Sequence, residues 1–171
     1  KYDFLFVCSA NWHRQKRLKE NIDLFLSLKK NSKFENSGLI VLGNNPDHIV
    51  NHSDVYYAGS VPHALCLEIF SASDWMIHLA WLDHCPNVVV EALSQSCPVI
   101  CSSSGGTKEI VKNNGLIIPE TKEYKYELLD YDSPYEIDVT QVSDLPNIDV
   151  TCDYLDIQKV AKEYERICTS P

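Results

Sequence analysis

Residues 74–93 read DWMIHLAWLDHCPNVVVEAL, and this stretch decides the fold class. Its apolar run at 75–79 is short and continuous, as expected of a parallel strand that is covered on both faces. A polar loop follows, and Pro86 then stands beside the start of an amphipathic stretch at 87–95, where proline is common in helices. The stretch therefore predicts one strand–loop–helix unit of an α/β protein.

The same unit recurs along the chain. Short apolar runs predict further strands at residues 2–8, 38–42, 55–58, 99–102 and 116–118. Amphipathic stretches predict helices at residues 17–30, 64–72, 107–113 and 153–168, the last with Leu155, Val160, Tyr164 and Ile167 inward. We expect one Rossmann-like domain over residues 1–171, with a doubly wound parallel sheet of about six strands flanked by helices.

Composition and charge narrow the class of protein. With 44% hydrophobic and 23% charged residues, the 171-residue chain has a globular composition, unlike disordered, collagen-like or disulfide-scaffold proteins. Its net charge of −9 repels polyanions, which argues against nucleic acid as a partner. The seven cysteines form no Cys-x-x-Cys pair and no cluster with histidines, so we expect reduced thiols in a cytoplasmic compartment and no metal site.

One segment departs from the repeat. Residues 120–150 contain nine acidic residues and only two basic ones, Lys122 and Lys125, so this segment cannot hold phosphate. Its tyrosines predict a long surface excursion that packs on the domain, and a partly mobile loop is the alternative.

The basic residues gather at one predicted helix start. Arg14, Lys16 and Arg17 follow the first strand directly, where unpaired amides and the helix dipole favour anions. In an acidic chain this cluster predicts an anion pocket, and a solvated helix start is the equally supported alternative.

Two further helix starts follow later strands. In the first, Asp83 lies in the loop and Glu91 lies one turn into the helix, where it could accept hydrogen bonds from vicinal hydroxyls or simply interact with the dipole. In the second, Gly105 and Gly106 allow the backbone to approach a ligand closely, and a tight turn is the alternative.

Taken together, these stretches resemble the C-terminal half of a family 4 (group 1) retaining glycosyltransferase. The resemblance covers roughly residues 2–119 and the final helix, and it rests on Asp83 through Glu91 and on Gly105-Gly106-x-x-Glu109. That family has a GT-B architecture, in which two Rossmann-like domains face each other and the C-terminal one holds the nucleotide-sugar donor. The dinucleotide glycine fingerprint and the P-loop do not occur, which weakens NAD-binding and kinase interpretations.

The resemblance implies a role for individual residues. Arg14, with Lys16 or Arg17, fills the place of the basic residues that bind the diphosphate, and Asp83 stands where the family has a glutamate near the donor sugar. Aspartate keeps the charge but is one methylene shorter. Glu91 matches the glutamate that binds the ribose hydroxyls. The remaining implied donor contacts are Asn87, Val88, Gly105, Gly106, Glu109, Ser60 and Val61.

The resemblance also implies a function. The chain is expected to bind a nucleotide-diphosphate sugar for retaining transfer to a glycan, lipid or other acceptor. No metal or cofactor is implied, because the basic cluster supplies the positive charge at the diphosphate. We expect the acceptor-binding N-terminal domain, and any membrane association, in another part of the same chain or in another chain. Two alternatives remain: a GT-B nucleotide-sugar epimerase, and a non-catalytic module that binds a nucleotide sugar.

Overall fold

The apolar runs of the sequence pair in one parallel sheet. The computed structural model describes residues 1–125, 128 and 130–169. Within these residues the strands are β1 (Phe4–Ser9), β2 (Ser37–Leu42), β3 (Val55–Gly59), β4 (Trp75–His78), β5 (Val99–Ser102) and β6 (Gly115–Ile118). The six strands lie in the order β3-β2-β1-β4-β5-β6, and every neighbouring pair is parallel. The predicted doubly wound α/β fold is therefore confirmed.

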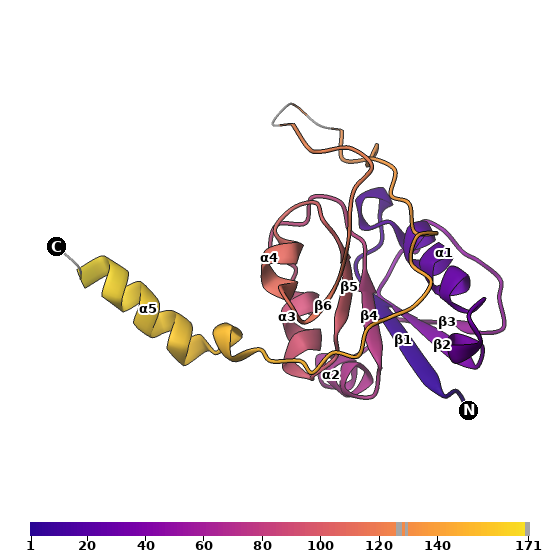
Figure 1. Cartoon of the computed structure of the whole chain (residues 1–171), viewed down its shortest axis with the longest axis horizontal. Helices are drawn as coiled ribbons and strands as arrows, with labels where there is room; N and C mark the ends of the chain where they lie inside the picture. Colours follow the sequence, from indigo (N-terminus) through magenta and orange to yellow (C-terminus); the bar gives the residue numbers. More distant parts are fainter. Residues whose placement is uncertain (126–127, 129, 170–171) are drawn as a thin grey trace.

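Helices cover both faces of this sheet (Figure 1). They are α1 (Leu18–Leu28), α2 (His63–Ser71), α3 (Asn87–Ser94), α4 (Thr107–Val111) and α5 (Ile157–Thr169), with single 3₁₀ turns at Arg14–Lys16, Ser32–Phe34 and Asp153–Leu155. Alternate residues of β1 enter different cores: Phe6 packs with α1 on one face, and Val7 packs with α2, α3 and α4 on the other. The strand order reverses between β1 and β4, which is the topological switch point of the sheet.

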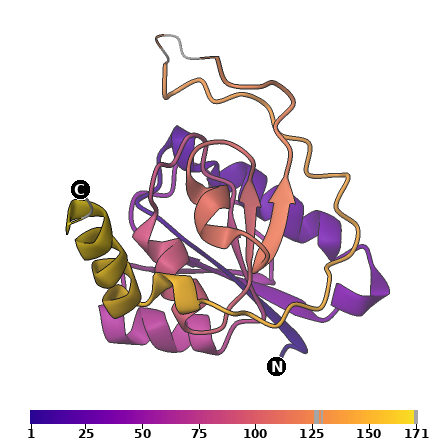
Figure 2. The same cartoon turned by 60° about the vertical axis from the view of Figure 1, so that its left-hand side comes forward.

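The acidic segment covers part of the α1 face without forming a helix or strand among its described residues. Val139, Val142 and Leu145 are buried in the same core as Ile100 of β5 and Ile118 of β6. Figures 1 and 2 show the segment running from the carboxyl ends of the strands back towards their amino ends. The segment is therefore part of the core packing as well as an excursion over the surface.

The inward packing expected for the last helix is confirmed for Leu155, which packs against the core, and is wrong for Tyr164 and Ile167. Helix α5 has no buried residue and projects away from the sheet, and Tyr164 and Ile167 are 67% and 58% exposed (Figure 1). The chain is anchored just before it, where the Tyr154 hydroxyl donates to the carbonyl of Ile110. The core on this face is filled by residues of α2, α3 and α4, and no residue of α5 belongs to it within the described part of the chain.

We predict that replacing Leu145 by alanine lowers the free energy of unfolding by about 2 to 4 kcal/mol, because it leaves a cavity in the core. Leu128, which is exposed, is the matched control, and its replacement by alanine should have little effect. Chemical denaturation of the two variants measures the difference. Equal stability of the two variants would contradict the packing described for residues 139–145.

Candidate functional site

Two loops meet at the switch point. The loop after β1 and the loop after β4 are joined by two hydrogen bonds: the backbone N–H of Trp81 donates to the carbonyl of Gln15 over 2.8 Å, and the Gln15 side chain donates to the carbonyl of Trp81 over 2.9 Å. In open α/β sheets, ligands bind outside the carboxyl ends of the strands at this point. The two joined loops carry most of the charged residues that the sequence singled out.

Lys16 and Asp83 form an ion pair across these loops. The Nζ of Lys16 lies 2.5 Å from Oδ2 of Asp83, and both side chains are largely but not fully buried. His78, the last residue of β4, is 4% exposed, and its Nε2 lies 3.3 Å from the same carboxylate oxygen. Lys16 and Asp83 are site residues that the sequence predicts, whereas His78 has no predicted role in the site.

The environment fixes the protonation of this cluster. Burial is the main cause that lowers the pKa of His78, so the ring is neutral at neutral pH. Burial opposes ionisation of Asp83, but hydrogen bonds from His78 and Lys16 outweigh it and hold its pKa well below the usual range. Since an ionised carboxylate can only accept, His78 donates through Nε2–H. The cluster thus holds one carboxylate between a neutral donor and an ammonium group.

Arg17 departs from its predicted role. Its side chain is fully buried, and the guanidinium donates to both carboxylate oxygens of Glu120 over 2.7 and 2.8 Å, and to the carbonyls of Leu79 and Tyr135. A buried guanidinium with an opposing carboxylate is already neutralised and cannot also hold a diphosphate without breaking that pair. Arg17 therefore joins the acidic segment to the sheet.

Arg14 lies at the surface. Its guanidinium makes a bidentate pair with Glu20 over 3.0 and 2.7 Å, and its side chain is 44% exposed. The hydrogen bonds that Arg14 donates to Glu20 raise the pKa of Arg14. An exposed pair of this kind contributes little to stability, so the guanidinium is able to leave Glu20 for a stronger anion.

Helix α3 places Glu91 beside the loop after β3. Oε1 of Glu91 lies 3.2 Å from Nε2 of His63, the first residue of α2, and the Glu91 side chain is 28% exposed. Ser60 and Val61 lie in the loop between β3 and α2, so the structure brings Glu91, which the resemblance assigns to the ribose, close to two other implied donor contacts. Asn87 and Val88 open α3, where Asn87 is exposed and Val88 is half-buried.

The two glycines approach protein backbone. A Cβ atom at Gly105, whose φ is +69°, would overlap the carbonyl of Asp83, and a Cβ at Gly106 would overlap the carbonyl of His84. The N–H of Gly106 donates to the Asp83 carbonyl over 2.9 Å. The need for glycine is therefore explained by packing of the loop after β5 against the loop after β4.

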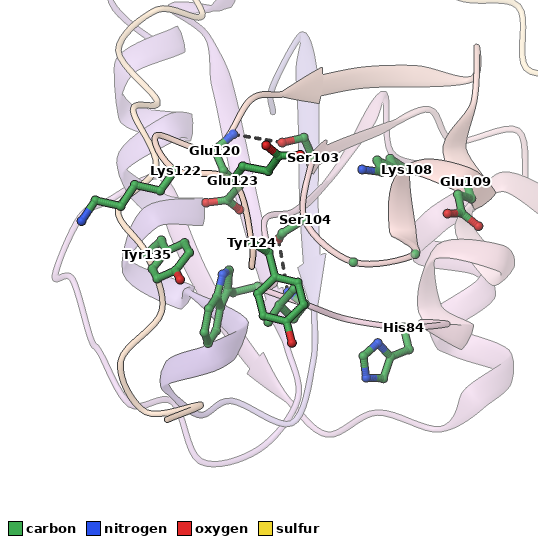
Figure 3. Close-up of a pocket in the computed structure, with 14 residues that line it drawn as sticks. His84, Ser103, Ser104, Lys108, Glu109, Glu120, Lys122, Glu123, Tyr124 and Tyr135 are labelled. Carbon is green, nitrogen blue, oxygen red and sulfur yellow. Dashed lines mark hydrogen bonds between the residues drawn. The ribbon is translucent and has the colours of Figure 1, made fainter. Parts of the chain in front are cut away.

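A cavity of about 610 Å³ lies beside these glycines (Figure 3). It includes three predicted site residues, Gly105, Gly106 and exposed Glu109, whereas the Lys16–Asp83 pair and Glu91 lie outside its lining. The opposite wall comes from the acidic segment, through Tyr124 and other residues that sequence reasoning did not assign to a site. The feature of the sequence that could have indicated this wall is the group of tyrosines within the acidic segment.

Two further findings concern metal binding and membrane spanning. Among the described residues, no group of three His, Cys, Asp or Glu side chains is arranged to hold a metal ion. None of the described helices combines the length and the apolar character needed to cross a bilayer.

Comparison with known families identifies the class of protein. Residues 1–128 match the model of the family described as glycosyl transferases group 1, and the chain belongs to this family. No curated protein matches the sequence significantly.

Solved structures share the fold at low sequence identity. WaaG, a glycosyltransferase involved in lipopolysaccharide biosynthesis, is 21% identical, with a TM-score of 0.58 over 70% of this chain and 34% of its own. HepE of Anabaena, solved in complex with UDP-glucose, is 17% identical, with a TM-score of 0.57 over 68% of this chain and 35% of its own. Sucrose-phosphate synthase of Thermosynechococcus elongatus is 19% identical, with a TM-score of 0.57 over 70% of this chain and 33% of its own. The chain thus spans about a third of the length of these proteins.

We predict that His78 makes the protein less stable as the pH falls below about 6.5, its ordinary pKa. Between that value and its lower pKa in the native state, the unfolded chain binds a proton that the native state does not, so acidification favours unfolding. Replacing His78 by glutamine should flatten this part of the profile, measured by denaturation at several pH values.

Asp83 affects the pH dependence of stability at lower pH than His78, because the stability that its ionised form contributes is lost only as the pH falls below its ordinary pKa of 3.8. His48, in the loop after β2, is the control, and His48→Gln should leave the slope near pH 6 in place. An unchanged slope in His78→Gln would show that another group causes it.

Proposed function

We propose that this chain is the donor-binding half of a family 4 retaining glycosyltransferase and that it binds a nucleotide-diphosphate sugar. The observation that carries the proposal is the Lys16–Asp83 pair at the switch point of the sheet, at 2.5 Å. Membership in the group 1 family and the fold shared with glycosyltransferases support it. HepE, which has the same fold, was solved with UDP-glucose.

In this proposal the diphosphate lies against the loop after β1 and the start of α3. Lys16 contributes an ammonium group, and the first amides of α3, near Asn87 and Val88, point at the anion together with the helix dipole. Arg14 exchanges Glu20 for a phosphate oxygen. Glu91 accepts hydrogen bonds from the ribose hydroxyls, and the segment with Ser60 and Val61 borders the base.

The same groups would act in the transfer step. When the bond from the anomeric carbon to the diphosphate breaks, negative charge grows on the leaving group and positive charge on the sugar ring. Lys16 and Arg14 stabilise the leaving diphosphate, and the Asp83 carboxylate, which stays ionised, stabilises the sugar cation. None of these residues has to form a covalent bond to the sugar.

The acceptor would be bound by a second half, in the same longer chain or in another chain. The match to this chain covers only about a third of each of these solved proteins, which supports this arrangement. Any membrane association belongs to that half. We also propose a cytoplasmic location, which the free state of all seven cysteines supports.

A non-catalytic nucleotide-sugar-binding module is the second candidate. It is favoured by one observation: the shorter Asp83 side chain is engaged by both Lys16 and His78 and does not extend freely towards a sugar. Release of free sugar or its transfer, assayed with the donor half and its acceptor half together, separates the two candidates. Turnover supports the enzyme, and tight donor binding without turnover supports the module.

Calorimetric titration of the chain with UDP, GDP and ADP tests the proposal. We expect one of the three to bind and the corresponding nucleoside to bind much more weakly, because the diphosphate contacts the charged residues. Absence of binding by all three would contradict the proposal.

We predict that Lys16→Gln weakens binding of the nucleoside diphosphate by about ten- to a hundredfold, as expected for loss of a charge-assisted hydrogen bond. Lys19, an exposed lysine of α1 that pairs with Asp23, is the matched control, and Lys19→Gln should bind normally. Equal affinity of the two variants would place the diphosphate elsewhere.

We also predict that Glu91→Gln weakens binding of the ribonucleotide about tenfold, because the charged acceptor for the ribose hydroxyls is lost. The 2′,3′-dideoxy nucleotide lacks these hydroxyls, so its affinity should change little. Calorimetry on the wild type and the variant with both ligands gives the comparison. The same loss for both ligands would exclude a ribose contact.

A further inference from the structure

His78 is a buried polar residue at the switch point that the proposed donor contacts do not use. It is the last residue of β4, and only 4% of its side chain is exposed. The strand residues before it, Trp75, Met76 and Ile77, are buried and apolar, so hydrophobic packing does not require a histidine here. Burial of a polar group costs free energy unless a hydrogen bond compensates it. Within the described part of the chain, the partner that compensates His78 is Asp83.

Two donors share one carboxylate oxygen of Asp83. Lys16 Nζ lies 2.5 Å from Oδ2, and His78 Nε2 lies 3.3 Å from the same atom. The second distance is just beyond that of an ordinary N–H···O hydrogen bond, so Lys16 is the stronger partner in this state. The main chain at Asp83 is fixed separately, because the N–H of Gly106 donates to its carbonyl over 2.9 Å. The carboxylate therefore stays beside His78 if Lys16 moves.

Lys16 can move, and His78 cannot. Lys16 is carried by the single 3₁₀ turn Arg14–Lys16 and 21% of its side chain is exposed, whereas β4 is an inner strand between β1 and β5. In the proposed function the Lys16 ammonium group turns towards a diphosphate. Only 14% of the Asp83 side chain is exposed, so water cannot fully replace the lost ammonium group. A largely buried carboxylate that loses its partner destabilises the bound state, unless another group neutralises it.

We propose that His78 is a positioning residue that keeps Asp83 paired when Lys16 binds a diphosphate, and that His78 takes up a proton in this exchange. The inference rests on the proposed function, because the diphosphate is what draws Lys16 away. The proton comes from the solvent and binds Nδ1, since Nε2 already carries the hydrogen that is donated to Asp83. An imidazolium–carboxylate pair thus replaces the ammonium–carboxylate pair, and the Asp83 carboxylate keeps its place.

The direction of the pH effect follows from the charges around the ring. In the free protein, burial lowers the pKa of His78 and the positive charge of Lys16 lowers it further, whereas Asp83 raises it. Departure of the ammonium group and arrival of a negative phosphate both favour the imidazolium, so binding raises this pKa. At a pH between the free and bound values, binding takes up a proton, and the affinity for the diphosphate therefore rises as the pH falls.

Asp83 and Lys16 are the charged groups that change the pKa of His78 in the free protein. Because side chains alternate along a strand, His78 lies on the sheet face that α2, α3 and α4 cover. The titratable residues of these helices and of β5 are Cys101, His63, Cys66, Glu68, Glu91, Lys108 and Glu109. Burial raises the pKa of the two thiols, so both stay protonated. His63 contacts Glu91 over 3.2 Å, and its contribution stays constant when only position 78 is changed.

Calorimetric titration of the full chain measures the proton uptake. The probes are inorganic pyrophosphate, UDP, GDP and ADP, each titrated near pH 6.5 in PIPES and in imidazole, two buffers that differ in their heat of ionisation. The difference in binding heat between the buffers gives the number of protons taken up per ligand. His78→Gln keeps an N–H donor but cannot bind a proton, so it should take up fewer protons than the wild type, by up to about one per ligand.

The comparison between the two proteins isolates His78. Titration of the ligand's own phosphate groups is the same in both proteins and cancels in the difference. His48→Gln, in the loop after β2, is the matched control and should keep the uptake of the wild type.

His78→Leu tests the hydrogen bond separately from the proton. Leucine fills the buried position but has no donor, so Asp83 would lose both partners when Lys16 moves. We expect His78→Leu to bind the diphosphate probes about tenfold more weakly than His78→Gln does, as for a lost hydrogen bond to a charged group. The proton measurement on His78→Gln does not depend on the stability of the leucine variant.

Each outcome decides. Lower proton uptake in His78→Gln than in the wild type, with a probe that binds both, supports the proposal, and equal affinity of His78→Leu and His78→Gln would overturn the positioning role. Binding with the same uptake in the wild type and in His78→Gln overturns the proton exchange and leaves the proposed function intact. Uptake that depends on His78 with pyrophosphate, without binding of UDP, GDP or ADP, supports the exchange and refutes the proposed function. No binding of any probe refutes both.

Discussion

The hydrogen bonds between Gln15 and Trp81 join two loops that are 66 residues apart in sequence. They hold the end of β1 against the end of β4, where the strand order reverses. The ion pair of Lys16 with Asp83 and the bond from Arg17 to the carbonyl of Leu79 continue the same contact. Lys16, Arg17 and Asp83 are therefore held by contacts between the two loops, whereas Arg14 pairs within its own part of the chain with Glu20.

The sequence predicts the fold because the hydrophobic pattern of each strand and helix lies within a short stretch of the chain. The apolar run predicted at 99–102 is strand β5 with the same bounds, and the helix predicted at 87–95 is α3 to within one residue. Hydrophobic periodicity indicates these elements, and the alternation of strands and helices predicts a parallel sheet. No distant contact is needed to identify such elements.

The site was harder to predict because it depends on distant partners. The sequence shows three basic residues together, but Arg17 turns inward to meet Glu120, which lies 103 residues further along the chain. The amphipathic pattern of the last helix predicts an apolar face and gives no information on what covers it. Gly105 and Gly106 fit a ligand contact and a backbone contact equally well, and only the position of the loop after β4 decides between them.

The acidic segment connects the fold with the site. Its aliphatic residues pack against β5 and β6 in place of a helix, and Glu120 and Tyr135 bind Arg17 at the carboxyl ends of the strands. The same stretch forms the outer wall of the cavity. A segment that looks like an insertion in sequence thus closes one side of the core and shapes the space beside the switch point.

The central claim is that the diphosphate of a nucleotide sugar binds where the loops after β1 and β4 meet. Amide chemical-shift mapping of the ¹⁵N-labelled chain, titrated in turn with UDP, GDP and ADP, tests it most directly. We predict that at least one of them shifts the amides of residues 13–17 and 83–88 most strongly, with smaller changes near Ser60 and Val61. Shifts confined to other parts of the chain, or no shift with any of the three, would contradict the account.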